Sequence, residues 1–135
     1  MTLPASRRSA REYQRAMVES ASPTELVVIL YDGAIRFVAQ ARALMPDGDR
    51  EARNTALVKA QRIVGELLST LDREAGEPVV TNLSRVYAYM LRLLVEANLH
   101  DRPEPLDEVA GLLRELREAW SQMEQQARTA SNGSA

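Results

Sequence analysis

The sequence predicts an all-α protein, specifically an antiparallel up-down four-helix bundle with a short N-terminal helical or extended strap. In four long segments the apolar residues recur at steps of three and four, the spacing of one face of a helix. No segment shows the period-two alternation of a β-strand. Because clusters of proline, glycine and aspartate leave only short connections between the segments, antiparallel neighbours are favoured.

The first predicted helix runs from Pro23 to about Met45. Ser22 can cap it, Pro23 suits the first helical position because its missing N–H has no partner there, and Glu25 can reach back to the N–H of Ser22. This helix holds two apolar stripes. The first, expected in the core, is Leu26, Leu30, Gly33, Phe37 and Ala41, and the second is Val28, Tyr31, Ile35 and Val38. The second stripe is either buried by the protein itself or left open for a partner.

Three further helices are expected along the chain. The second covers residues 50–75 and has Asp49 as its cap, the third covers residues 78–99, and the fourth starts near residue 105. The third helix, like the first, carries more apolar residues than one buried face requires.

The two ends of the chain differ in composition from the helical segments. Residues 1–12 are polar and basic, which predicts a flexible arm, and residues 129–135 are small and polar, which predicts a disordered tail. Residues 13–128 are then one bundle domain, long enough to bury a core. Its first part, residues 13–21, is weakly periodic and would be stable only when docked on the rest. The alternative is a disordered tail that happens to contain a tyrosine.

The composition argues against several classes of function. The 135 residues carry a formal net charge of −2, no cysteine and a single histidine, His100. A nucleic-acid-binding domain usually shows a basic excess, and thiol chemistry needs cysteine. His100 lacks the Glu-x-x-His spacing of a di-metal bundle, and the glycines are too scattered for a phosphate loop. We therefore expect no catalytic, metal or cofactor-binding residues and no nucleic-acid partner.

The sequence contains no apolar run long enough for a signal peptide or a bilayer span. We therefore expect a cytoplasmic protein without membrane insertion.

From the residues alone, two kinds of function are compatible with a helical bundle. The first is an enzyme of the chorismate mutase type, which would clamp a small anion with inward-facing arginines such as Arg36, Arg62 and Arg92. Arginines at such positions also suit solvated faces, which weakens this interpretation. The second is a regulatory bundle whose extra apolar stripes meet in a homodimer.

Asp32 and Gly33 interrupt the apolar first helix. A glycine inside a helix costs about 1 kcal/mol relative to alanine, and one that is kept often permits a close approach of another segment. Asp32 could hold such a segment, for example the N-terminal strap. The alternative is an exposed acid beside a tolerated glycine.

Several short pieces between residues 13 and 120 form a recognisable pattern. They are Tyr13-Gln14, Ser22-Pro23, Tyr31-Asp32-Gly33, Tyr87-Ala88-Tyr89-Met90, Glu96-Ala97-Asn98 and Trp120. In their order and spacing they resemble the flagellar secretion chaperones called FliS, whose signature is matched here by Ser22, Pro23, Asp32 and Gly33.

This resemblance implies a function that composition does not show. Proteins of that family are antiparallel helical bundles without enzymatic activity. They bind the C-terminal segment of flagellin in the cytoplasm, prevent its premature polymerisation and help deliver it to the export gate of the flagellar type III apparatus. A monomer or a weak homodimer is expected, without a cofactor.

The resemblance also suggests where the client would bind. A client-binding groove is expected at Val28, Tyr31, Ile35 and Val38 on one side and at Tyr87, Leu91 and Val95 on the other. The strap, with Tyr13, Gln14 and Met17, would cover this groove until the client displaces it.

Overall fold

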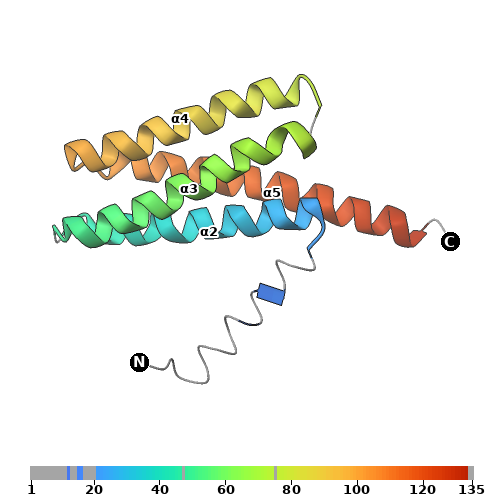
Figure 1. Cartoon of the computed structure of the whole chain (residues 1–135), viewed down its shortest axis with the longest axis horizontal. Coiled ribbons are helices and arrows are strands. Elements are labelled where there is room, and N and C mark those ends of the chain that lie inside the picture. The colour runs from blue at the N-terminus through green and yellow to red at the C-terminus, as the bar shows by residue number, and fades with distance from the viewer. Residues whose placement is uncertain (1–11, 13–14, 17–20, 47, 75, 134–135) are drawn as a thin grey trace.

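The computed structural model describes residues 12, 15–16, 21–46, 48–74 and 76–133. The long helices in this part of the chain are α2 (Pro23–Leu44), α3 (Arg50–Glu74), α4 (Val79–His100) and α5 (Glu104–Gly133). Consecutive helices run in opposite directions (Figure 1). The predicted antiparallel all-α bundle is confirmed, and the described residues contain no strand.

The order of the helices around the bundle follows their order in the chain. α2 contacts α3 and α5, and α4 contacts the same two helices, so α2 and α4 lie diagonally across the core. This arrangement follows from the short connections, which place each helix beside the one before it.

The helix starts use the predicted caps. The hydroxyl of Ser22 accepts the N–H of Glu25 at 3.2 Å, and the carboxylate of Asp49 accepts the N–H of Ala52 at 3.1 Å. The carboxylate of Glu25 interacts with the backbone N–H of Ser22, as predicted, and also accepts a hydrogen bond from Arg128 on α5 at 2.9 Å. This charge-assisted bond holds the pKa of Glu25 below its usual value.

The prediction of a disordered tail over residues 129–135 is wrong for residues 129–133, because these residues continue α5. Figure 1 shows that α5 runs on past the start of α2. Arg128 pairs with Glu124 at 2.8 Å and with Glu25 at 2.9 Å, which supports the helix just before this extension. Charge pairs one turn apart stabilise a helix, and no proline follows Pro105 to end it earlier.

The buried face of α2 lies between the two predicted stripes. Its buried residues are Val27, Tyr31, Gly33, Ala34, Val38 and Ala41, whereas Leu26, Leu30 and Phe37 of the expected core stripe are half-buried. Gly33 faces Ile63 of α3, and Val28 lies beside residues of α5. A helix between two neighbours buries the strip midway between them and half-covers the stripes on either side. Both stripes of α2 are therefore used by its own bundle.

Candidate functional site

Tyr31, Val38 and Tyr87 were expected to line the client groove, but they are buried in the core. The hydroxyls of Tyr31 and Tyr87 hydrogen-bond to each other, and their ring centroids lie 6.5 Å apart. Burial raises the pKa of both phenols. The pair joins the diagonal helices α2 and α4, so these residues form no wall of an open groove in this structure.

The remaining groove residues lie on different sides of the bundle. Val28 and Ile35 are half-buried on α2, Leu91 is half-buried on α4, and Val95 is exposed on α4. Because α2 and α4 are diagonal, α3 or α5 separates their outer surfaces. The two sets of residues therefore cannot face each other across one groove.

The exposed large apolar side chains gather mainly on α4. Val79, Val95 and Leu99 of α4 are 46%, 53% and 71% exposed, and Met123 of α5 is 52% exposed. Leu91, Val95 and Leu99 follow one another at four-residue steps, so they lie along one face of the helix. Of these three, Val95 and Leu99 are exposed, and neighbouring exposed apolar residues are typical of surfaces that bind another protein.

A pocket opens between the start of α4 and the second half of α5. It has a volume of about 480 Å³ and is lined mainly by apolar residues, namely Val79, Leu83, Leu116, Ala119, Trp120 and Met123, together with Gly76 and Asn82. The walls can accept an apolar side chain, and the amide of Asn82 can hydrogen-bond to a backbone. We call this the α4/α5 pocket.

The apolar spacing in the sequence did not indicate the α4/α5 pocket. Leu83, Leu116, Trp120 and Met123 fit the apolar stripes of their helices, and such spacing predicts only that they face a neighbour. The available signal was the excess of apolar residues on the third predicted helix, which includes Val79.

The signature residues Asp32 and Gly33 have structural roles. The carboxylate of Asp32 accepts a hydrogen bond from Nε of Arg117 on α5 at 2.8 Å, so its partner is this helix. A Cβ atom on Gly33 would lie 3.1 Å from Cδ1 of Ile63. The close approach is thus made by a side chain of α3, and the missing Cβ lets it pack there.

Three ion pairs cross the boundary between α2 and α5. They are Glu25–Arg128 at 2.9 Å, Asp32–Arg117 at 2.8 Å and Arg42–Asp107 at 2.9 Å. The acid lies on α2 in the first two pairs and on α5 in the third. Each exposed pair contributes at most about 1 kcal/mol, but a shifted register would place like charges together. The pairs therefore favour one antiparallel register.

A buried arginine joins α3 to the end of α4, a feature that sequence reasoning missed. Arg53 is 3% exposed and pairs with Asp101 at 2.6 Å. Its Nε also donates to the side-chain oxygen of Asn98 at 3.2 Å. Asp101 ends α4 with a left-handed backbone, φ 53°. Because its charge is paired and hydrogen-bonded, Arg53 can be buried and fastens this end of the bundle.

The arrangement does not support an arginine clamp. Arg36, Arg62 and Arg92 lie on three different helices, and all three are exposed. The guanidinium of Arg36 lies 5.2 Å from the ring of Phe37, and that of Arg92 lies 5.7 Å from the ring of Tyr89. Arg36 and Arg92 thus cover neighbouring aromatic rings, and the three arginines enclose no common site.

The described residues offer neither a metal centre nor a membrane-spanning helix. No group of three or more side chains there could hold a metal ion. None of the helices in that part of the chain is both long and apolar enough to cross a membrane. Tyr13, Gln14 and Met17, the predicted strap residues, lie outside the described part of the chain, as does the predicted arm apart from residue 12.

Comparison with known proteins assigns the bundle to a family. The model of the family described as flagellar protein FliS matches residues 5–127. This chain belongs to the FliS family. It is 42% identical over 111 residues to the flagellar secretion chaperone FliS of Salmonella typhimurium, covering 82% of each chain. It is 37% identical over 122 residues to the protein of that name from Bacillus subtilis, covering 90% of each. The flagellar secretion chaperone FliSB of Pseudomonas aeruginosa is 35% identical over 117 residues, which is 84% of this chain and 93% of that protein.

FliS membership confirms the resemblance found in the sequence. These relatives are named as chaperones, which points to a role other than catalysis and to a protein client in flagellar export. Within this FliS bundle, the apolar surface of α4 and the α4/α5 pocket are the candidate client-binding features.

Proposed function

We propose that this protein is a cytoplasmic chaperone that binds the C-terminal segment of flagellin. It keeps that segment from polymerising prematurely and aids its delivery to the export gate of the flagellar type III apparatus. The observation that carries this proposal is the set of exposed apolar side chains, Val79, Val95, Leu99 and Met123, on a bundle whose own core is complete. The choice of flagellin as the client rests on the resemblance to the FliS family, and membership of that family supports it.

In this proposal the client binds to α4 and to the adjacent part of α5. An amphipathic helix of the client can lay its apolar residues against Leu91, Val95 and Leu99, or insert one into the α4/α5 pocket. Complete burial of one aliphatic side chain is worth about 1.5–3 kcal/mol. Several such contacts are needed, because a disordered client loses conformational entropy when it binds.

The strap has a regulatory role in this proposal. Residues 13–17 compete with the client for the apolar surface and are displaced when it binds. This part of the proposal is supported by the weak helical periodicity of residues 13–21 and by the family resemblance.

The direct test is co-purification of flagellin with the full chain, repeated with flagellin that lacks its C-terminal segment. Full-length flagellin should be retained and the truncated form lost. Calorimetry with a peptide of the segment should show a negative heat-capacity change, because apolar surface is buried. Retention of the truncated flagellin would contradict the proposal.

A homodimer formed by the same apolar surface is the competing outcome. Light scattering should then show a stable dimer that does not dissociate when the flagellin peptide is added.

A further inference from the structure

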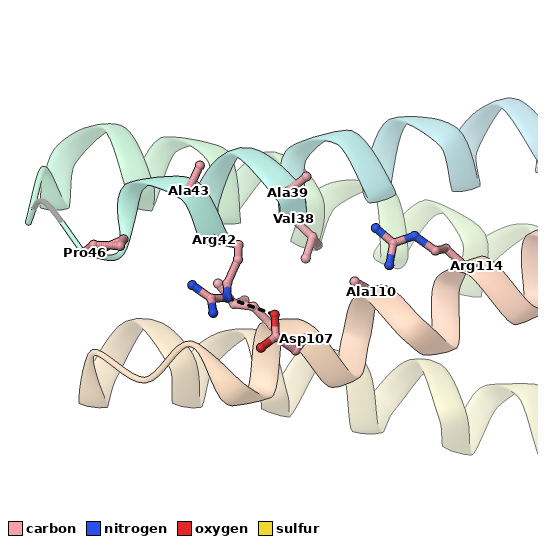
Figure 2. Close-up of a pocket in the computed structure, with 9 residues that line it drawn as sticks. Val38, Ala39, Arg42, Ala43, Pro46, Asp107, Ala110 and Arg114 are labelled. Carbon is pink, nitrogen blue, oxygen red and sulfur yellow. Dashed lines mark hydrogen bonds and ion pairs between the residues drawn. The ribbon is translucent and has the colours of Figure 1, made fainter.

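A second pocket lies between the C-terminal half of α2 and the N-terminal half of α5 (Figure 2). Its volume is about 380 Å³, and Val38, Leu106 and Ala110 supply an apolar lining. It involves no residue of α4 and lies at the opposite end of the bundle from the α4/α5 pocket. A client that occupies one pocket therefore leaves the other open. We call this second feature the α2/α5 pocket.

Two guanidinium groups line the α2/α5 pocket. Arg42 donates from Nε to Asp107 at 2.9 Å, a bond that leaves both terminal nitrogens of the guanidinium available as donors. Arg114 points along the pocket from its other end, as Figure 2 shows. Among the described residues Arg114 makes no ion pair, and Asp107 is the one acid in the lining. The pocket therefore combines an apolar surface with an excess of positive charge.

The chemistry of this pocket suits a carboxylate attached to an apolar group. Guanidinium groups bind carboxylates through paired N–H donors, and these charge-assisted bonds are stronger than neutral ones. A volume of about 380 Å³ accommodates a residue or two, which is less than a continuous helix occupies. Pro46 lies at one end of the lining. A chain that ends inside the pocket enters from one side and does not need to leave by the other.

We infer that the α2/α5 pocket binds the C-terminal carboxylate of the client chain. The last side chain of the client packs on Val38, Leu106 and Ala110, and its carboxylate pairs with Arg42 or Arg114. This inference rests on the proposed function, in which the client is the C-terminal segment of flagellin. It adds that the chaperone recognises the end of the chain as well as its apolar face.

Calorimetry on the full chain can test this with two peptides of the C-terminal segment of the cognate flagellin. One peptide has a free C-terminal carboxylate and the other a C-terminal amide. The free acid should bind about fivefold more tightly, because the amide removes the charge that the arginines recognise. The difference should shrink as salt is added, since screening weakens exposed charge pairs.

Substitutions in the pocket assign that difference to particular residues. Arg114→Gln breaks no ion pair of the described residues, so it should leave the fold intact and bring the affinity of the free acid close to that of the amide. Asp107→Asn should tighten binding of the free acid alone, because Asp107 competes for Arg42. Arg62→Gln, at an exposed arginine of α3 outside both pockets and outside the proposed client surface, is the matched control and should change neither affinity.

The outcomes separate this inference from the proposed function. Equal affinity for the two peptides, or a preference that survives Arg114→Gln together with Arg42→Gln, overturns the inference and leaves flagellin binding in place. If neither peptide binds, the proposed function fails and the inference fails with it. If the ligand of the pocket is instead an acidic side chain within the segment, the two peptides should bind equally well. The arginine variants should then bind both peptides less tightly.

Discussion

The hydroxyls of Tyr31 on α2 and Tyr87 on α4 hydrogen-bond to each other across the centre of the bundle. In the described part of the chain every buried side-chain nitrogen or oxygen has a hydrogen-bond partner. The hydroxyl of Tyr31 also interacts with the side chain of Trp120, whereas that of Tyr87 depends on Tyr31, so removing the Tyr31 hydroxyl leaves the hydroxyl of Tyr87 alone.

Tyr31→Phe should lower the free energy of unfolding by about 1–3 kcal/mol, because the hydroxyl of Tyr87 then loses its partner. The double variant with Tyr87→Phe should recover part of that loss, since neither hydroxyl is then left alone, although the indole N–H of Trp120 still lacks Tyr31 as its acceptor. Urea denaturation monitored by circular dichroism measures both. Losses that simply add would show that the hydroxyl pair is not coupled.

Gly33 and Ile63 should be coupled in the same kind of measurement. Ile63→Val removes Cδ1, the atom that a Cβ on residue 33 would meet at 3.1 Å. In that background Gly33→Ala should stabilise the protein by about 0.5–1 kcal/mol through its helix propensity. In the natural background the gain should be smaller or reversed by crowding. An equal effect of Gly33→Ala in the two backgrounds would show that the contact is unimportant.

The stability of the bundle should depend on Asp101 in acid. The hydrogen bond from Arg53 lowers the pKa of Asp101 below its usual value of about 3.8. The folded state therefore binds this proton less readily than the unfolded state. The stabilisation is present above the unfolded pKa and is lost as the pH falls through the lower folded pKa.

Urea denaturation at several pH values checks this linkage. Asp101→Asn should unfold more easily than the natural protein at pH 7, and it should lose less stability than the natural protein on going from about pH 5 to about pH 2. Asp107→Asn, at the exposed acid of the Arg42 pair, is the control. Parallel pH profiles for Asp101→Asn and the natural protein would rule out the proposed role.

Client binding should be sensitive to Met123. Met123→Glu places a charge at the rim of the α4/α5 pocket and should weaken binding of the flagellin peptide about tenfold, because apolar contact is lost and a charge loses water. Gln126→Glu adds the same charge at an exposed position of α5 outside this pocket and should have little effect. Circular dichroism verifies that both variants fold. An unchanged affinity of Met123→Glu would remove this pocket from the client surface.

Deletion of residues 1–18 should change flagellin affinity, because it removes the competing strap and leaves the cap at Ser22 in place. Tighter binding is the expected direction, measured by calorimetry on the shortened and complete chains. An affinity that stays the same would end the competition model.

The sequence alone determined the fold class and the start of each helix. Ser22, Pro23 and Asp49 act locally, through groups a few residues away, so their roles can be read without knowledge of the neighbours. Apolar spacing also identified the long helices. The end of α5 was missed because an ion pair with α2, between Arg128 and Glu25, adds to the weak local signal of its last turns.

Only the tertiary structure decided which face of each helix is buried. Val28 and Tyr31 belong to the same stripe in the sequence, yet Tyr31 is in the core and Val28 lies at the boundary with α5. Periodicity defines stripes on a helix, but the positions of its neighbours set which stripe lies at the centre. The diagonal placement of α2 and α4 likewise excluded a groove with walls on both, and the packing of four helices left α4 with apolar side chains uncovered.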